Sequence, residues 1–282
     1  MVTEQYSREK VLSLLPERPL DTHKGDYGRI LLLCGSIGYT GAPALAAMGA
    51  LRVGAGLVYL CVPSSIYEIE AGRLLEPIVI PVEDENGKFS IDAIMQIADL
   101  LPKMNAVLIG PGIGRSDGTY HVVNWIVKNF IGPLVIDADG INVLQEHIDI
   151  LRGRTSPTIL TPHEGEFVRL GGVLTGNRIE NAKDLAEDIG CIVVLKGYET
   201  IITDGSTCYI NPTGNPGMAV GGSGDILAGV ITGLLGQGLS PIEASVSGAW
   251  LHGAAGDICA KEIGQYGMLP SDMLNALPRL LK

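Results

Sequence analysis

Residues 211–238 read NPTGNPGMAVGGSGDILAGVITGLLGQG, a glycine-rich turn that runs directly into an apolar helix. The turn is Gly221-Gly222-Ser223-Gly224, and the helix is expected over 225–237. A helix N-terminus has backbone N–H groups without intrahelical partners, and the helix dipole adds partial positive charge there. Glycines let this backbone approach an anion closely. The stretch therefore predicts a phosphate-binding turn.

Asp225 falls in the first turn of that helix. An acidic residue at this place stabilises a helix without any catalytic role. Beside an anion site it also has the position of a general base. The sequence contains neither a G-x-x-x-x-G-K-[ST] loop nor a G-x-G-x-x-G fingerprint after a strand, so neither of these two nucleotide-binding motifs is present.

Upstream of this turn, short Val/Ile/Leu runs alternate with amphipathic stretches. Runs of that kind are typical of strands buried on both faces of a parallel sheet. Strands are expected over 29–35, 57–62, 77–82, 106–110, 133–137, 158–161 and 191–196. Helices are expected over 42–54, 64–73, 90–101, 117–129, 177–189, 225–237 and 241–262. Around Asp204-Gly205 the pattern changes to a hairpin, which predicts an antiparallel margin on the parallel sheet.

Polar or glycine-rich loops follow four of these strands: IGPGIG, DADG, TPHEGE and LKG. In a parallel sheet the carboxyl ends of the strands lie at one edge, where ligands bind. The four loops therefore predict one cleft. Asp137 and Asp139 lie two residues apart, so we expect their side chains to point the same way. They would serve as a metal or ribose anchor, or only as a polar helix cap.

Composition excludes several classes of protein. The 282 residues carry 20 Lys+Arg and 31 Asp+Glu, a net charge of −11 that disfavours a nucleic-acid binder. The first residues lack the apolar core of a signal peptide, and no apolar run is long enough to span a membrane, so we expect a cytoplasmic protein with no membrane partner. Five widely spaced cysteines predict buried free thiols. His252, on a helix rich in Ala and Gly, is expected to be a partly buried, hydrogen-bonded histidine rather than a metal ligand.

Seven motifs together resemble one family, the ADP/ATP-dependent NAD(P)H-hydrate dehydratases of the ribokinase-like superfamily. They are HKGDYGR, YTGAP, IGPGIG, VIDADG, LTPHEGEF, VVLKGYET and NPTGNPGMAVGGSGD, and they cover nearly the whole chain. The resemblance implies an α/β fold, a ribokinase-like three-layer sandwich with a mostly parallel central sheet, helices on both faces and an antiparallel margin. It implies a single domain over 1–282, without room for the epimerase domain that bacterial members often carry.

The resemblance also implies a reaction. Hydrated NADH or NADPH (NADHX or NADPHX), in the S epimer, is phosphorylated on its hydroxyl from ADP or ATP, and loss of phosphate restores the ring double bond. Asp225 would be the catalytic base and would also contact the hydrate. Gly222, Ser223 and Gly224 would form the anion hole. Nucleotide binding would add Lys196, Gly197, Tyr198, Glu199 and Thr200; hydrate binding would add Ala42, Gly112, Gly114 and His163.

Further expectations follow from the same resemblance. Glu166 would hold Mg²⁺ through water, with Glu164 as a competing candidate. The enzyme would be a homo-oligomer, a tetramer in the family, and a separate NAD(P)H-hydrate epimerase would act with it. Two alternatives use the same turn: a ribokinase-like kinase of a small vitamin-precursor alcohol, and a non-catalytic nucleotide-binding module. The NPGMAV and TPHEGE blocks favour the dehydratase over the kinase.

Overall fold

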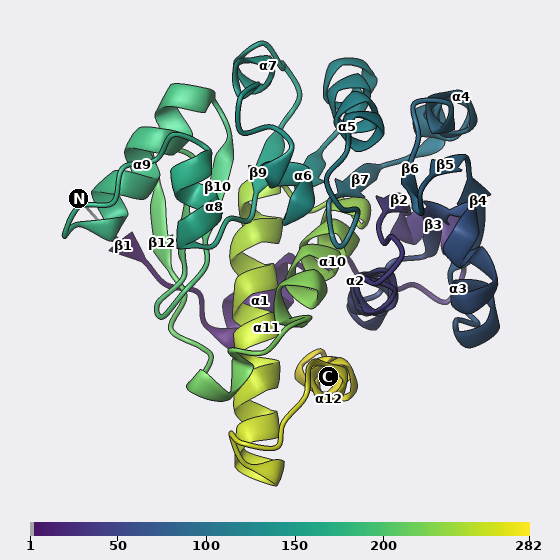
Figure 1. The fold of residues 1–282 in the computed structure, drawn as a ribbon. Coiled ribbons are helices and arrows are strands. Elements are labelled where there is room, and N and C mark those ends of the chain that lie inside the picture. The colour runs from purple at the N-terminus through teal and green to yellow at the C-terminus, as the bar shows by residue number, and fades with distance from the viewer. Residues whose placement is uncertain (1–2) are drawn as a thin grey trace.

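The central feature of the fold is a ten-stranded sheet, seen in a computed structural model that describes residues 3–282. The strands lie in the order β1-β12-β11-β10-β9-β8-β7-β2-β3-β4 (Figure 1). They are β1 (Thr3–Glu4), β2 (Arg29–Leu33), β3 (Leu57–Pro63), β4 (Ile78–Val82), β7 (Ala106–Ile109), β8 (Leu134–Ile136), β9 (Thr158–Leu160), β10 (Ile192–Leu195), β11 (Ile201–Thr203) and β12 (Cys208–Ile210). All pairings from β10 to β4 are parallel, and β11 is antiparallel to both of its neighbours. The mostly parallel sheet with an antiparallel margin is confirmed.

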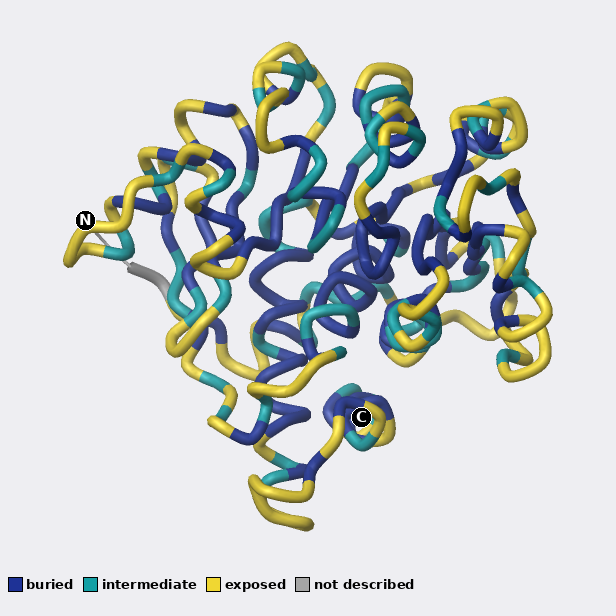
Figure 2. The backbone as a smooth tube through the Cα atoms, in the orientation of Figure 1, coloured by how far each residue is buried: buried dark blue, intermediate teal, exposed yellow. Residues whose placement is uncertain are grey.

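Helices cover both faces of this sheet (Figure 1). One face carries α1 (Arg8–Leu14), α2 (Gly41–Arg52), α10 (Ser223–Gly236), α11 (Pro241–Ile263) and α12 (Pro270–Leu280). The other carries α4 (Ala93–Ala98), α5 (Asp117–Asn129), α7 (Asp149–Arg152) and α9 (Arg178–Ile189). Side chains alternate along a strand, so Ile30 packs in the first core and Leu31 in the second. Figure 2 shows the central strands of the sheet as buried, and every residue of β7, β8 and β9 is buried, whereas the edge strand β4 is partly exposed.

Every helix and strand range expected from the sequence contains a helix or strand, and the elements that were missed are short, except for α12 (11 residues). The expected helices at 64–73 and 90–101 each contain a 3-10 turn, η2 (Ser64–Ile66) before α3 (Tyr67–Arg73) and η3 (Leu101–Lys103) after α4. The missed elements are α1, α6 (Asp139–Asn142), α7, α8 (Glu164–Arg169), α12, η1 (Lys24–Tyr27), η4 (Pro216–Met218), β1 and the hairpin of β5 (Asp84–Glu85) and β6 (Lys88–Phe89). Most of these are too short to form without caps or tertiary packing, so their hydrophobic pattern carries little signal.

Helix α10 packs closely against α2. A Cβ atom at Gly229 would collide with the backbone oxygen of Ala46, and one at Gly233 would lie 2.8 Å from the backbone oxygen of Ala50. These two glycines face α2, so the backbones of the two helices come close together. Helix α10 also packs against α11, where a Cβ atom at Gly248 would lie 2.6 Å from the Ile231 side chain. This packing fixes the position of the glycine turn at the start of α10.

The cysteines are buried free thiols, as expected. No helix within residues 3–282 combines the length and apolar character needed to cross a membrane.

Candidate active site

The glycine turn opens α10 as predicted. Gly222 is the N-cap, and its positive φ of 99° is a backbone conformation that favours glycine. The first intrahelical bond joins the N–H of Ile226 to the oxygen of Gly222. The N–H of Ser223 donates within the turn, to the oxygen of Val220 at 3.2 Å. The amides of Gly224 and Asp225 precede the first bonded residue and so have no carbonyl partner inside the helix.

His252 hydrogen-bonds to Ser223 of this turn. Its Nε2 lies 2.9 Å from the backbone oxygen of Ser223 and 3.2 Å from Ser223 Oγ. Burial lowers the pKa of His252 to about 4, so the ring is neutral near neutral pH. A neutral ring donates its Nε2 proton to the Ser223 carbonyl, so the ring nitrogen and the carbonyl oxygen both have a hydrogen-bond partner. His252 is thus the hydrogen-bonded histidine that the sequence predicted, and the structure buries it.

Three neighbouring strands bring an ion pair to the same place. Lys196 follows β10, Asp137 follows β8 and Thr161 follows β9. The Lys196 Nζ lies 2.8 Å from Asp137 Oδ1, which also accepts a 2.7 Å hydrogen bond from Thr161 Oγ1. Burial alone would lower the pKa of Lys196, but the carboxylates of Asp137 and Glu166 outweigh it and raise that pKa. The lysine is therefore a permanent cation at the edge of the sheet.

Asp225 lies beside this ion pair. A Cβ atom at the preceding residue, Gly224, would lie 3.3 Å from Lys196 Nζ and 4.0 Å from Asp137 Oδ2. Burial raises the pKa of Asp225 to about 6, the negative charge of Asp137 adds to this, and Lys196 opposes it. A carboxylate with such a pKa can accept a proton near neutral pH. Beside a cation and free helix amides, the arrangement suits transfer of a phosphoryl group.

His163 and Glu166 form the N-terminal cap of α8. His163 Nδ1 accepts from the N–H groups of Gly165 (2.9 Å) and Glu166 (3.3 Å), and Glu166 Oε2 accepts from the His163 N–H at 2.9 Å. Glu166 Oε2 also lies 3.8 Å from Lys196 Nζ. The Glu166 side chain is buried, whereas that of His163 is 56% exposed. Capping thus accounts for the place of Glu166, and His163 is left to face solvent at the cleft.

The predicted hydrate-binding loop adjoins the Asp137 loop. A Cβ atom at Gly112 would lie 3.0 Å from the Cβ of Ala42, so these two predicted residues are neighbours. The N–H of Gly114 donates to Asp139 Oδ2 at 3.1 Å. The structure therefore joins Ala42, Gly112 and Gly114 to the strand ends that carry Asp137.

The side chains of Asp137 and Asp139 do not share a partner, contrary to the expectation that they point the same way. Asp137 contacts Lys196 and Thr161, whereas Asp139 contacts the Gly114 N–H, Asn142 Nδ2 (3.0 Å) and Arg115. The physical reason lies between them: β8 ends at Ile136, and Ala138 has φ +50° and ψ −119°, so strand alternation no longer applies. Each aspartate instead serves a different loop.

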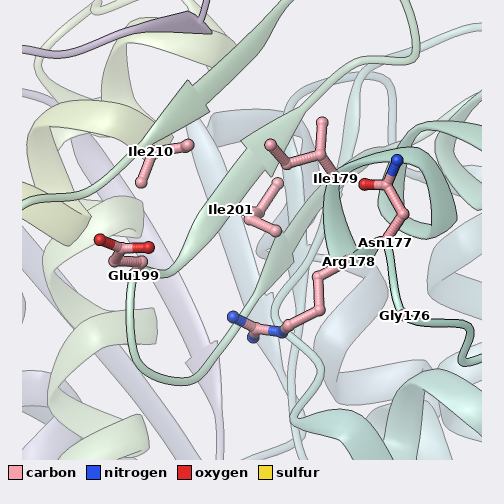
Figure 3. A pocket seen from close by; sticks show the side chains of 7 residues that line it. All are labelled: Gly176, Asn177, Arg178, Ile179, Glu199, Ile201 and Ile210. Carbon is pink, nitrogen blue, oxygen red and sulfur yellow. The ribbon is translucent and has the colours of Figure 1, made fainter.

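Residues 196–200 form the loop after β10. Tyr198 is 87% exposed, Glu199 has a positive φ of 54°, and Thr200 Oγ1 donates to the oxygen of Gly197 at 3.0 Å. A surface pocket on one side of the loop is lined by His163, Glu164, Gly165, Arg178, Lys196, Gly197 and Tyr198. Another lies between the loop and the start of α9 (Figure 3) and is lined by Gly176, Asn177, Arg178, Ile179, Glu199, Ile201 and Ile210.

Sequence reasoning missed Arg178, which lines both pockets. A signal was present: Arg178 is the first residue of α9, where the helix dipole disfavours a basic side chain. The guanidinium also contacts Glu164, with Nε 3.3 Å from Oε1.

A family model described as NAD(P)H-hydrate dehydratase matches residues 30–279. The chain belongs to this family. The ADP-dependent (S)-NAD(P)H-hydrate dehydratase of Bacillus subtilis is 34% identical over 98% of this chain and 97% of its own. A crystal structure of the ADP/ATP-dependent NAD(P)H-hydrate dehydratase from the same organism, co-crystallised with ATP/Mg²⁺, superposes with a TM-score of 0.85. It is 32% identical and covers 99% of this chain and 98% of that one.

Among longer relatives of this dehydratase family is the bifunctional NAD(P)H-hydrate repair enzyme of Moorella thermoacetica, 43% identical over all of this chain. The present chain spans 56% of the length of that protein. Membership of the family confirms the resemblance drawn from the seven motifs. A crystal structure of a ribokinase-like superfamily protein from Enterococcus faecalis, 26% identical over 99% of this chain and 95% of its own with a TM-score of 0.86, confirms the ribokinase-like fold.

Proposed function

We propose that this chain dehydrates the S epimer of hydrated NADH and NADPH, with ADP or ATP as phosphoryl donor. The observation that carries the proposal is Asp225, a partly buried carboxylate in the first turn of α10, whose pKa burial raises to about 6. The family match and the names of the Bacillus subtilis relatives support the substrate and the donor.

The proposed reaction begins at the hydroxyl of the hydrated ring. Asp225 takes the hydroxyl proton as the oxygen attacks the terminal phosphorus of the nucleotide. The O–P bond forms while the bond from that phosphorus to the bridging oxygen breaks, and AMP leaves from ADP, or ADP from ATP. Lys196 and the amides of Gly224 and Asp225 stabilise the charge on the transferred phosphoryl. The C–O bond then breaks with release of phosphate, and loss of a proton from the adjacent carbon restores the double bond.

The loop at 196–200 and the turn at 222–224 would bind the nucleotide in this scheme, and Ala42, Gly112, Gly114 and His163 would bind the hydrate. The two sets are close together, because Lys196 of the nucleotide set bonds to Asp137 and Gly114 of the hydrate set donates to Asp139. His163 is suited to its role because its ring is exposed while Nδ1 is fixed by the α8 cap.

Magnesium fits the donor chemistry of this site. Within residues 3–282 no three His, Cys, Asp or Glu side chains are arranged as a metal-binding group. Mg²⁺ typically keeps several waters and binds nucleotide phosphates with one or two carboxylates. Glu166, through water, and Asp137 would hold such an ion beside Lys196. Its chemistry would be neutralisation of charge on the nucleotide phosphates.

The name of the Moorella relative, a bifunctional repair enzyme, supports the proposal that an NAD(P)H-hydrate epimerase acts alongside this chain. The family resemblance supports a single domain and a homotetramer in the cytoplasm, which light scattering and cell fractionation would test.

The deciding experiment incubates the protein with hydrated NADH, Mg²⁺ and either ADP or ATP. Recovery of the near-ultraviolet absorbance of reduced nicotinamide is the expected result, and the nucleotide that supports it identifies the donor. An Asp225→Asn variant provides the matched control, since it should bind nucleotide but lose most turnover. Failure to recover absorbance with either nucleotide, by folded protein given the reactive epimer, would contradict the proposal and favour the small-alcohol kinase.

A further inference from the structure

The guanidinium of Arg178 bonds to the backbone of the loop that follows β10. Its Nη1 donates to the oxygen of Tyr198 at 2.7 Å, and its Nη2 donates to the oxygen of Lys196 at 3.3 Å. We propose that Arg178 is a positioning residue for the nucleotide, which it serves by fixing the conformation of residues 196–200. This inference rests on the proposed function, because it assumes that this loop binds the nucleotide.

Gly197, between the two bonded carbonyls, has no side chain and so leaves room for the guanidinium of Arg178. Its φ is +152°, and a Cβ atom at this position would lie 2.6 Å from Arg178 Nη2. A glycine is therefore needed for the guanidinium to reach both carbonyl oxygens. Arginine suits this task because its donors form a rigid planar fork that can engage two acceptors at once.

The two hydrogen bonds determine where the loop amides point. A trans peptide is planar, with its C=O and N–H on opposite sides. When the oxygen of Lys196 is turned to Arg178, the N–H of Gly197 in the same peptide is turned away from it. The same holds for the oxygen of Tyr198 and the N–H of Glu199. Arg178 thus directs two backbone donors to the opposite side of the loop, as binding of an anionic ligand requires.

Arg178 itself is held by two other elements. It starts α9, whose N-cap Asn177 accepts a hydrogen bond from the N–H of Glu180 at 3.3 Å, and Figure 3 shows its side chain extending from this helix to the loop that carries Glu199. Glu164, in the first turn of α8, lies 3.3 Å from Arg178 Nε. The arginine therefore connects α8, α9 and the loop.

The connection extends into the catalytic site. Lys196 contributes its carbonyl to Arg178, while its N–H donates to the oxygen of Pro162 at 2.8 Å and its Nζ bonds to Asp137. A change in the Lys196 peptide would consequently move the cation beside Asp225. Because Arg178 bonds to residues of the proposed nucleotide loop, we expect its loss to weaken nucleotide binding more than hydrate binding.

The test compares Arg178→Ala and Arg178→Lys with Arg152→Ala. Arg152 is a matched control, because it forms surface ion pairs with Asp149 and Asp188, away from the loop. Binding of ATP with Mg²⁺ is measured by calorimetry without hydrate, and hydrogen exchange is measured over 196–200. Melting temperature confirms that each variant is folded.

Loss of two charge-assisted hydrogen bonds should weaken ATP binding by about tenfold or more in Arg178→Ala, with faster exchange over 196–200. Arg178→Lys should recover part of the affinity, and Arg152→Ala should match wild type. In turnover assays KM for the nucleotide should rise while KM for the hydrate stays constant. ATP affinity within about twofold of wild type in folded Arg178→Ala would overturn the inference.

The same measurements separate this inference from the proposed function. A wild-type protein that binds ATP but does not dehydrate the hydrate refutes the proposed function alone, since Arg178 is still judged on binding and exchange. A wild-type protein that binds neither ADP nor ATP overturns both.

Discussion

Asp137 and Lys196 form an ion pair at the ends of β8 and β10, with 2.8 Å between Oδ1 and Nζ. The carboxylate is almost fully buried and is bonded a second time by Thr161. One cation here thus serves three carboxylates, since Glu166 and Asp225 both interact with Lys196 as well. Burial raises the pKa of Asp225 to about 6 and the charge of Asp137 adds to this, because the one nearby cation, which is shared among these carboxylates, offsets the two effects only in part.

The first prediction concerns the pH dependence of turnover. Asp225 acts as a base only when it is ionised, and burial raises its pKa to about 6. Turnover should therefore rise with pH through about 6 and then level off on the alkaline side. Rates measured from acidic to neutral pH, in buffers of constant ionic strength, would show this. Full activity well below pH 6 in a folded enzyme would exclude Asp225 as the base.

The second prediction concerns stability. The raised pKa means that the folded state binds the Asp225 proton more tightly than the unfolded state, whose pKa is near 3.8. This group consequently stabilises the fold less as pH rises from about 4 to about 6. Asp225→Asn should be more stable than wild type above pH 6, by on the order of 1 kcal/mol, and no more stable in acid. Thermal melts of wild type and Asp225→Asn, measured at neutral pH and in acid, test this prediction. Equal melting temperatures of the two proteins at neutral pH would contradict it.

The third prediction tests the charge of Asp137. Asp137→Asn keeps the shape of the side chain but removes a negative charge that helps to raise the Asp225 pKa. The pH midpoint for turnover should shift to lower pH, while the maximal rate falls because Lys196 loses its ion-pair partner. Asp149→Asn is the control, because Asp149 pairs with Arg152 on the surface. An unchanged midpoint would show that Asp137 does not set the Asp225 pKa.

The strands and the phosphate turn were predictable from the sequence because their signals are local. Val/Ile/Leu runs report burial on both faces, and glycines before an apolar helix report an exposed helix N-terminus. The four loops that were expected to form one cleft do meet, since Asp137 bonds to Thr161 and Lys196, and Gly114 of the IGPGIG loop donates to Asp139.

The parts that were missed depend on tertiary contacts. Arg178 is 18 residues from Lys196 in sequence, and nothing near it indicates that its guanidinium reaches a loop carbonyl. The different partners of Asp137 and Asp139 follow from the backbone of Ala138, a residue with no such preference of its own. The spacing of Gly229 and Gly233 allows a close helix contact, but only the fold determines that the partner is α2.

The fourth prediction compares two glycines in one turn. A Cβ atom at Gly224 would lie 3.3 Å from Lys196 Nζ, on the side where phosphate is expected, whereas one at Gly221 meets no atom within 4 Å. Gly224→Ala should thus lower turnover by about tenfold or more with little change in stability, and Gly221→Ala should resemble wild type. Turnover rates of the two variants at saturating nucleotide distinguish them from each other. Equal rates would mean that the phosphate does not bind beside Gly224.

The last prediction concerns Ala138, whose φ of +50° and ψ of −119° form a conformation that glycine adopts far more easily. Such strain costs on the order of 1–3 kcal/mol, whereas replacing alanine by glycine costs about 0.4–1 kcal/mol through the unfolded chain. Ala138→Gly should therefore match or exceed wild type in stability. Turnover should fall, since a more flexible residue 138 no longer fixes the flanking Asp137 and Asp139.

Ala71→Gly is the matched control for this change, because Ala71 is an exposed residue inside α3 with ordinary helical geometry. It should lose about 0.5–1 kcal/mol of stability and retain activity. Denaturant unfolding and steady-state kinetics of the two variants provide the comparison. If Ala138→Gly is destabilised as much as Ala71→Gly, the backbone at 138 is not strained. If it is stable and fully active, the conformation of Ala138 does not position the two aspartates.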